Sequence, residues 1–391
     1  MVTTEDSSEG RSTSQRVGLV LGPILFFVFF MRGMGSPEVS AMAAVAVLMA
    51  TWWITDAIPL SGTALLPLVL YPVLGIMKTR ECAPVYVNST IFLFIGGFMI
   101  AVTMEKWRLH KRIALWIIRR VGGGPSRIIL GFMVAAAFLS MWISNTATAI
   151  MMLPIALAII LQLEEKIGRE ACHPFTVALL LGIAYACSVG GMATLVGTPP
   201  NLSFARIFEI TFPNAEPIAF GQWLLMALPI TLVLLAVIWL LLTKVFYRLG
   251  DSLKVDQDVV RREYAALGRM SFEERAVLAV FLATAFGWVF RKDLALGVVT
   301  IPGWSRLLPH AHLIDDATVA IGMAMILFFI PVRSPNTGSR TVMGVNVFTR
   351  IPWNIVLLFG GGFALAHGFR VTGLSELIGT RFAGLEGAPP Y

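Results

Sequence analysis

Two polar stretches interrupt long apolar segments of this sequence, and they hold the residue types that could do chemistry. The first reads S-M-W-I-S-N-T-A-T from Ser140 to Thr148, and the second reads G-G-M-A-T-L-V-G-T-P-P-N from Gly190 to Asn201. Both stretches offer side-chain hydroxyls and an amide, and the second also contains glycines, which leave the backbone accessible. Neither contains a charged side chain. Neutral oxygens and free N–H groups of this kind can hold a hard cation together with an anion.

The first stretch is predicted to be the tip of a re-entrant hairpin over residues 128–163. An apolar run of about sixteen residues stands on either side of it. Such a run makes a helix of ~24 Å, which is shorter than the ~30 Å hydrocarbon core of a bilayer. Two full spans are the alternative. At the tip, the first helix would end in unpaired carbonyls and the second would begin with free N–H groups, with Asn145 or Thr146 as its N-cap.

The second stretch is predicted to break a membrane helix. Pro199 and Pro200 remove two backbone donors and force the preceding residue out of the helical region. Gly197 lets the backbone approach a ligand closely, and Thr198 adds a hydroxyl. A single S-N-T often serves helix packing and a single P-P a plain kink. Their pairing, about fifty residues apart, favours a site for sodium and a carboxylate instead.

The composition predicts an all-α polytopic membrane protein. Of 391 residues, 57% are hydrophobic and 14% are charged, and the mean hydropathy is +0.79, whereas soluble domains carry roughly 25% charged residues. Three cysteines without a CxxC pair and five histidines argue against a disulfide framework, a structural zinc site and a metal enzyme. The net charge of +7 is interpreted as basic cytoplasmic loops and not as nucleic-acid binding.

Apolar segments outside the hairpin are predicted to form further membrane helices. They are Val17–Met31, Ser36–Ile54, Ser61–Met77, Thr90–Met104, Phe175–Val196, Gln222–Phe246, Ala276–Phe290, Ala317–Val332 and Trp353–Phe369. Placing the N-terminus in the cytoplasm puts most of the 30 basic residues on the cytoplasmic face, as the positive-inside rule requires. The basic amphipathic stretch Lys106–Arg120 is predicted to lie on the inner membrane surface, and Asp56 and Glu105 are interpreted as structural.

An internal repeat is visible when the chain is shifted by 265 residues. Thr90–Pro125 then falls on Ile355–Pro390, with F-x-G-G-F at Phe94 matching the same pattern at Phe359. The alternative is two glycine-rich helices that pack closely through small residues. Repeats of this kind, often inverted, build many secondary transporters, which hold the substrate where the two halves meet.

Both polar stretches resemble the divalent anion/sodium symporter family, the sodium-coupled di- and tricarboxylate carriers. T-D-A-I-P-L at Thr55–Leu60 and F-G-G-G at Phe359–Gly362 fit the same family pattern. The resemblance implies a homodimer in which each protomer has a scaffold domain and a transport domain that moves like an elevator. It implies sodium ligands at Ser140, Ser144, Asn145 and Gly197, and substrate contacts from Ser144, Asn145, Thr146, Thr198 and Pro199.

With this resemblance, the chain divides into five predicted regions. These are a cytoplasmic tail at 1–16, scaffold helices of the first repeat at 17–121, the first half of the transport domain at 122–246 (hairpin 128–163, broken helix 175–211, helix 222–246), a charged cytoplasmic linker at 247–275, and scaffold helices of the second repeat at 276–391. Family members carry a second S-N-T on a second hairpin, which the repeat would place beyond Tyr391. The sequence is therefore expected to be a fragment or a truncated relative, and a form ending there is expected to insert without transporting.

The predicted function is sodium-coupled secondary active transport of divalent organic anions, with C4-dicarboxylates such as succinate, malate and fumarate as substrates. A carrier of sulfate or another oxyanion, and a non-transporting or regulatory membrane fragment, are the alternatives. An intramembrane hydrolase is disfavoured because neither polar stretch contains His or Lys, so no enzyme activity is expected. Sodium is the coupling ion and no cofactor is expected. The expected partners are dicarboxylate, lipid and a second copy of the chain in a bacterial inner membrane, with no nucleic acid.

Overall fold

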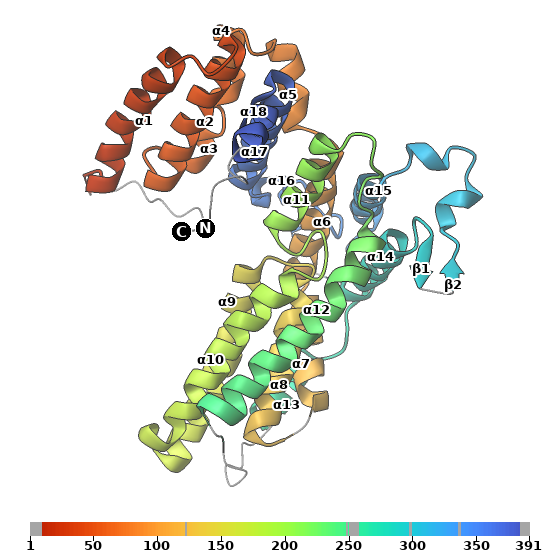
Figure 1. The fold of residues 1–391 in the computed structure, drawn as a ribbon. Helices are drawn as coiled ribbons and strands as arrows, with labels where there is room; N and C mark the ends of the chain where they lie inside the picture. Colours follow the sequence, from red (N-terminus) through yellow and green to blue (C-terminus); the bar gives the residue numbers. More distant parts are fainter. Residues whose placement is uncertain are drawn as a thin grey trace. The chain divides into compact units, whose positions relative to one another are not determined.

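The computed structural model describes residues 10–121, 123–247, 249, 258–296, 299–334 and 338–383. In this part of the chain almost every regular element is a helix, as Figure 1 shows. The chain folds into two compact, discontinuous units. The first takes residues 1–91, 203–217 and 352–391, and the second takes 92–202 and 218–351. The predicted division into scaffold and transport regions follows different boundaries and stays a prediction.

Seven helical segments among the described residues are long and apolar enough to cross a membrane. They are Thr13–Met31, Pro37–Thr55, Thr79–Lys106, Asn145–Ile167, Arg169–Gly191, Phe220–Phe246 and Trp353–Thr372. Three shorter apolar helical segments, Leu60–Val73, Pro125–Ser140 and Asp316–Phe329, accompany them. The prediction of an all-α integral membrane protein is confirmed.

The first unit packs its helices around α17. Its elements are α1 (Thr13–Met31), α2 (Pro37–Thr55), α3 (Leu60–Thr63), α4 (Leu66–Val73), α5 (Thr79–Tyr86), α17 (Trp353–Thr372) and α18 (Leu374–Ala383). The hydroxyl of Tyr71 donates to the carbonyl of Ala364 at 2.9 Å, so α4 is tied to α17 across a buried core. The backbone of Ala64 lies so close to Gly361 that a Cβ at this position would not fit. Such close approach of two backbones is typical of helix packing in membranes.

The predicted continuous helix at Ser61–Met77 is wrong, because the structure has two short helices there. α3 ends at Thr63 and α4 begins at Leu66. Pro67 stands in the first turn of α4, where its missing N–H costs little, and Pro72 lies near the end of this helix. Pro67 lacks the N–H that would bond to the carbonyl of Thr63 and continue one helix. Ala64 and Leu65 keep right-handed helical backbone angles, so the interruption is a short turn.

The second unit contains the candidate site. Its elements are α7 (Leu109–Val121), α8 (Pro125–Ser140), α9 (Asn145–Ile167), α10 (Arg169–Gly191), α12 (Phe220–Leu240) with a π-helical turn at Leu241–Phe246, α13 (Asp258–Ala266), α14 (Phe272–Val289), β1 (Leu294–Leu296), β2 (Val299–Ile301), 3₁₀ turns at Trp304–Leu307 and Ala311–Leu313, α15 (Asp316–Phe329) and α16 (Val347–Arg350). The helices α6 (Ser89–Lys106) and α11 (Pro199–Thr211) contribute residues to both units. Figure 1 shows α8, α9 and α10 running together.

The helices α8 and α9 form the predicted hairpin, with arms of unequal length. α8 has 16 residues and α9 has 23, so α9 is about 35 Å long at ~1.5 Å per residue. The second arm therefore extends past the predicted end at Leu163 and is long enough to span the hydrocarbon core. Whether the hairpin returns to its own side of the membrane stays a prediction.

The basic amphipathic stretch forms α7. The sequence predicted that it lies on the membrane surface, and the structure shows that several of its side chains are buried against other helices. It begins at Leu109, because Arg108 takes a left-handed conformation (φ 58°) that separates it from α6. Buried Arg112 pairs with Glu274 of α14 at 3.0 Å, and Lys111 pairs with Glu263 of α13 at 2.8 Å. The described part of the charged linker is therefore bound to α7 by these two ion pairs. The β1–β2 hairpin was not predicted.

The internal repeat reappears as two helix pairs, α6–α7 and α17–α18. The rings of Phe94 and Phe98 lie 5.9 Å apart in α6, and the matched rings of Phe359 and Phe363 lie 6.0 Å apart in α17. The matched glycines Gly96 and Gly361 each lie against an alanine, Ala320 and Ala64 respectively. The last matched positions, Gly122 with Gly387 and the partner of Pro125, lie outside the described residues.

Candidate functional site

The turn between α8 and α9 is short and polar. α8 ends at Ser140, and the N–H groups of Met141 and Ile143 donate to carbonyls of its last turn. Ser144 then takes an extended conformation (ψ 142°), and its Oγ accepts the N–H of Ala147 at 3.2 Å. The N-cap is thus Ser144, and the predicted caps Asn145 and Thr146 are wrong, since both lie inside the first turn of α9.

The side chains of the hairpin tip are accessible. Ser144 and Thr146 are exposed and Asn145 is half-buried. Because α9 begins here, its first N–H groups and the positive end of its dipole face the same space as these hydroxyls. The tip therefore offers neutral donors and acceptors that a small anion can reach.

The second break lies between α10 and α11. α10 ends at Gly191, and α11 begins at Pro199 with Pro200 next to it. Two prolines fit the first turn of a helix because the N–H groups they lack would have no partner inside the helix. The intervening loop is held by Thr194, whose Oγ accepts the N–H of Gly197 at 3.0 Å. The predicted broken helix over 175–211 therefore exists, and its first half, α10, begins six residues earlier than predicted, at Arg169.

The two breaks meet in the second unit. The hydroxyl of Thr194 donates to the carbonyl of Met141 in the hairpin turn at 2.5 Å. A Cβ on Gly191 would lie 2.6 Å from Oδ1 of Asn145, and a Cβ on Gly197 would lie 2.5 Å from the carbonyl oxygen of Gly191. Only glycine permits these close approaches. The sequence prediction that both polar stretches lie together is therefore supported by direct contacts.

Oxygen atoms crowd together where the breaks meet. Oγ of Ser140 lies 2.5 Å from Oδ1 of Asn145 and 2.7 Å from the carbonyl oxygen of Cys187. A serine hydroxyl carries one proton, so it can donate to only one of these two oxygens at a time. The unsatisfied oxygen lone pair and the carbonyl ends of α8 and α10 make this a place where a hard cation fits.

Asn201 is a residue beside the second break that the site prediction left out. Its Nδ2 group donates to the carbonyls of Gly191 at 3.0 Å and of Thr194 at 2.7 Å, and it lies 3.4 Å from the carbonyl of Met192. The side chain is buried. It supplies donors to the carbonyls that end α10, so it fixes the geometry of the break. Its place at the end of G-T-P-P-N was the available signal.

The ring of Trp142 packs the hairpin turn against neighbouring aromatic side chains. It stacks against Trp288 at 6.3 Å and Phe220 at 6.0 Å, and meets Phe281 edge-on at 5.0 Å. Aromatic pairs at these separations add stability beyond area burial. The hairpin turn therefore packs on an aromatic cluster from two other helices, α12 and α14. A tryptophan inside a polar motif was the signal for this role.

A buried ion pair fixes that aromatic cluster. Arg291 and Asp316 pair at 2.5 Å, and each side chain is more than nine-tenths buried. Asp316 also accepts the N–H of Phe220 through its carboxylate and the indole N–H of Trp288 through its carbonyl, both at 2.9 Å. Removing one partner of a buried pair strands the other charge, so this network rigidly positions the rings beneath Trp142.

The structure places the predicted site residues in two groups. Ser140, Asn145 and Gly197 lie in or beside the oxygen cluster, linked through Gly191. Ser144 and Thr146 stand exposed at the tip, and Thr198 and Pro199 are half-buried at the start of α11. Among the described residues, no hydrogen bond joins Thr146 to Thr198 or Pro199. No group of three or more His, Cys, Asp or Glu suited to a metal ion occurs in the described ranges.

Comparison with known proteins identifies the family. Residues 13–389 match the model of the sodium:sulfate symporter transmembrane region. The chain is 37% identical to a protein of Staphylococcus saprophyticus named sodium-dependent dicarboxylate transporter SdcS, over 99% of this chain and 74% of that relative. It is 37% identical to SdcS of Staphylococcus aureus strain MRSA252, over 97% of this chain and 72% of that relative. The chain therefore belongs to the sodium:sulfate symporter family, whose members are transporters and not enzymes.

Proposed function

We propose that this protein is a sodium-coupled secondary active transporter of divalent organic anions, with C4-dicarboxylates such as succinate, malate and fumarate as its substrates. Relatives at 37% identity carry the name sodium-dependent dicarboxylate transporter. The single observation that carries the proposal is the meeting of the two breaks, where the oxygen cluster at Ser140 and Asn145 adjoins the accessible tip at Ser144–Thr146.

The proposed sodium ligands are Ser140, Ser144, Asn145 and Gly197. Backbone carbonyls at helix ends are hard oxygen ligands, and broken membrane helices use them for alkali cations. The short contact between Oγ of Ser140 and Oδ1 of Asn145 (2.5 Å) supports this assignment. A cation placed there would balance oxygen lone pairs that a single hydroxyl proton leaves uncompensated.

The proposed substrate contacts are Ser144, Asn145, Thr146, Thr198 and Pro199. The N-terminal turns of α9 and α11 provide N–H groups and positive dipole ends for carboxylates. The hydroxyls at the tip are accessible, whereas the adjacent backbone is held by Thr194 and Asn201. A bound sodium ion next to this position would offset the charge of the dianion, so no basic side chain is needed in direct contact.

The setting of this proposal is a bacterial plasma membrane with the N-terminus in the cytoplasm. The basic helix α7 and the charged linker, which pair through Lys111 and Glu263, would then lie on the cytoplasmic side. A homodimer and an elevator-like movement of a transport domain within a lipid bilayer belong to the same proposal. They rest on the family resemblance of the two polar motifs.

Equilibrium binding tests the function directly. Labelled succinate is added to the purified chain in sodium buffer and in choline buffer, with Asn145→Ala as the matched control. Sodium-dependent binding that is lost in the variant is the expected result. Equal binding in choline buffer, or none in either buffer, would overturn the proposal. Uptake into liposomes under an inward sodium gradient is the second measurement, and uptake that follows pH in the absence of sodium would overturn sodium coupling.

A sulfate carrier is the second candidate, since the family model that matches is that of a sodium:sulfate symporter. The same neutral tip could bind sulfate, because helix N-termini accept any small divalent anion. Competition decides between the two candidates. Succinate should displace labelled sulfate at lower concentration than sulfate displaces labelled succinate, and the reverse order would favour the sulfate carrier.

A further inference from the structure

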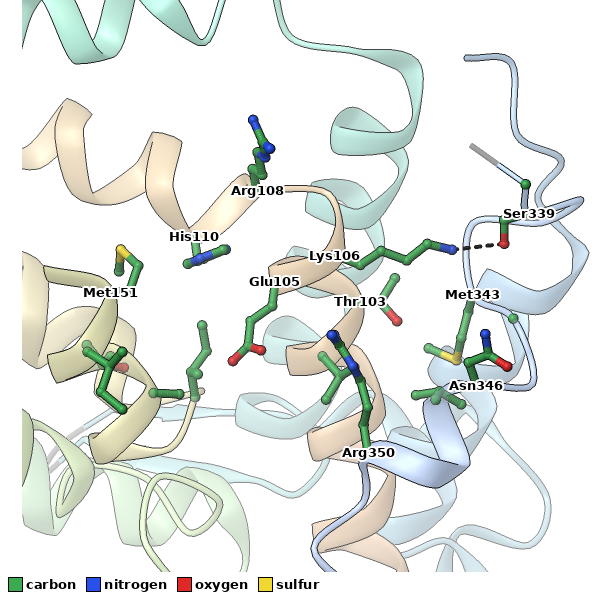
Figure 2. A pocket seen from close by; sticks show the side chains of 18 residues that line it. Thr103, Glu105, Lys106, Arg108, His110, Met151, Ser339, Met343, Asn346 and Arg350 are labelled. Carbon is green, nitrogen blue, oxygen red and sulfur yellow. Dashed lines mark hydrogen bonds between the residues drawn. The ribbon is translucent and has the colours of Figure 1, made fainter. Parts of the chain in front are cut away.

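A cavity of about 770 Å³ lies beside the hairpin arm α9 within the second unit. The end of α6, the start of α7, one side of α9 and the segment 338–350 surround it, as Figure 2 shows. Its volume falls in the range of ~300–1,000 Å³ that small-molecule sites occupy. Neither Ser144 nor Asn145 lines it, so it is a space next to the candidate site and not the site itself.

The charges around this cavity are mostly positive. Among the described residues that line it, Lys106, Arg108 and Arg350 are basic and Glu105 alone is acidic. His110 adds no charge at neutral pH, because burial and the neighbouring Lys111 lower its pKa although its ring bonds the carbonyl of Met104. A concave surface of net positive charge attracts and concentrates small anions.

Arg350 is the available cation that faces Glu105, since the side chain of Arg108 points away from both in Figure 2. The ammonium of Lys106 donates to the hydroxyl of Ser339 at 3.0 Å and to the carbonyl of Val342 at 3.2 Å. Arg350, by contrast, is exposed and makes no hydrogen bond or ion pair with the residues that the structure describes. Figure 2 shows its guanidinium and the carboxylate of Glu105 reaching toward the same part of the cavity, and the two charges interact without forming an ion pair.

The cavity continues to the hairpin next to the candidate site. Ile143 and Ala147, the residues on either side of the Ser144–Thr146 tip, form part of its wall. Thr148 lines it one helical turn after Ser144, to which its N–H is bonded at 3.0 Å. Thr148 is 1% exposed, and its buried hydroxyl has no hydrogen-bond partner in the described ranges. A buried polar group without a partner is costly unless a ligand or water satisfies it.

We infer that this cavity is an entry vestibule for small divalent anions, in which Arg350 binds the anion and Glu105 competes with it for the Arg350 guanidinium. An arriving dianion displaces the weaker interaction with Glu105, because it brings more charge and can approach the guanidinium in bidentate geometry. The dianion then lies beside Thr148, one turn from the tip. The inference rests on the proposed function only for the identity of the anion as a dicarboxylate.

Charged thiol reagents test the electrostatic potential in the vestibule without any transport assay. Asn346, an exposed residue of the cavity wall, is changed to cysteine, and an anionic and a cationic methanethiosulfonate are compared. Thr300→Cys on exposed β2 is the matched reporter outside the cavity. The three native cysteines are buried, so the unmodified chain gives the background rate. The anionic reagent is expected to react faster at position 346, relative to the cationic one, than at position 300.

Two charge-neutralising variants should move that rate ratio in opposite directions. Arg350→Gln is expected to lower the anionic-to-cationic ratio at position 346 by about two- to tenfold, and Glu105→Gln to raise it by a similar factor, as a unit charge a few ångström away would. Neither variant should change the ratio at position 300. A ratio at 346 that equals the control, or that Arg350→Gln leaves unchanged, would overturn the vestibule.

Protection separates this inference from the proposed function. Succinate and sulfate should slow labelling at position 346 in choline buffer as well as in sodium buffer, whereas acetate should not. The protection should persist in Asn145→Ala and disappear in Arg350→Gln. Protection that requires both sodium and Asn145 would mean binding at the hairpin tip alone, and would overturn the vestibule while leaving the function standing. Sodium-independent protection without sodium-dependent succinate binding would do the opposite.

Discussion

The hairpin tip and the break between α10 and α11 use the same residue types in opposite ways. At the tip, Ser144 and Thr146 are exposed and Asn145 is half-buried. In the break, Thr194 is fully buried and Asn201 is 7% exposed. The side chain of Thr146 makes no hydrogen bond with the described residues, and those of Ser144 and Asn145 each make one within the hairpin. The side chains of Thr194 and Asn201 each make several, all to backbone groups.

The two breaks are therefore expected to have different roles. The tip can give the hydroxyl of Thr146 to a ligand at little cost to the fold, and the amide of Asn145 at the cost of one hydrogen bond. The break gives backbone at Gly197 and the start of α11, and its side chains hold that backbone in place against the tip. Substitutions at the tip should therefore change ligand binding, and substitutions in the break should change stability as well.

The largest effect on binding is expected at the tip. Asn145→Ala and Thr146→Ala should each reduce sodium-dependent succinate binding by roughly 10- to 100-fold, since a hydrogen bond to a charged group contributes about 1.5–3 kcal/mol. Thermal unfolding of Thr146→Ala should stay close to that of the wild type because Thr146 is exposed. Asn145→Ala should lower the midpoint only slightly, because Ser140 loses one acceptor and keeps the carbonyl of Cys187 as the other. Unchanged succinate affinity in both variants would contradict the site assignment.

Asn201→Ala should affect both properties. It removes the donors that satisfy the carbonyls of Gly191 and Thr194, and each buried polar group left unpaired costs about 1–3 kcal/mol. A clear fall in the unfolding midpoint, together with weaker succinate binding, is the expected outcome. Asn354→Ala, at an exposed position of α17, is the matched control and should change neither. A fall in binding without a fall in stability would place Asn201 with the tip residues.

Thr194→Val tests the direct link between the two breaks. It preserves the shape of the side chain and removes the bonds to Met141 and Gly197. The loss should be about 1–2 kcal/mol of stability, as is usual for buried hydroxyls. Thr194→Ser should restore most of it because the hydroxyl returns. Equal stability of the valine and serine variants would show that these bonds do not hold the breaks together.

Ser140→Ala sharpens the sodium assignment with a smaller effect. Ser140 would bind sodium mainly through its carbonyl, which the substitution keeps, so the sodium concentration for half-maximal succinate binding should rise only a few-fold. Asn145→Asp should raise it more, because it replaces the amide whose Oδ1 lies 2.5 Å from Oγ of Ser140. Sodium titrations of succinate binding measure both. A stronger effect of Ser140→Ala would mean that the hydroxyl itself binds the ion.

The sequence predicted the helices and the meeting of the breaks because both leave local signals. Apolar runs set the membrane helices, and Pro199 with Pro200 set the start of α11. The support beneath the tip left no such signal. The Arg291–Asp316 pair and the stacking of Trp288 on Trp142 join residues far apart in the chain, and no period or motif connects them. The N-cap also differed by one residue from the prediction, because Ser144, Asn145 and Thr146 are all good capping or first-turn residues.

A carboxylate remote from both breaks gives the smallest effect and the baseline for the others. Burial alone would raise the pKa of Glu273, but its carboxylate accepts the N–H groups of Arg333 and Ser334 at 2.7 and 2.8 Å and the hydroxyl of Ser334 at 2.8 Å. These bonds lower its pKa from 4.5 to about 2. The stabilisation is therefore fully present above pH 4.5 and is lost as the pH falls from 4.5 toward about 2, since the unfolded chain binds the proton first.

Glu273→Gln should lower the unfolding midpoint at neutral pH, and the difference from wild type should shrink as the pH is stepped down through 4.5. Succinate binding at neutral pH should not change. A difference in midpoint that is independent of pH would show that these three bonds do not favour the ionised carboxylate.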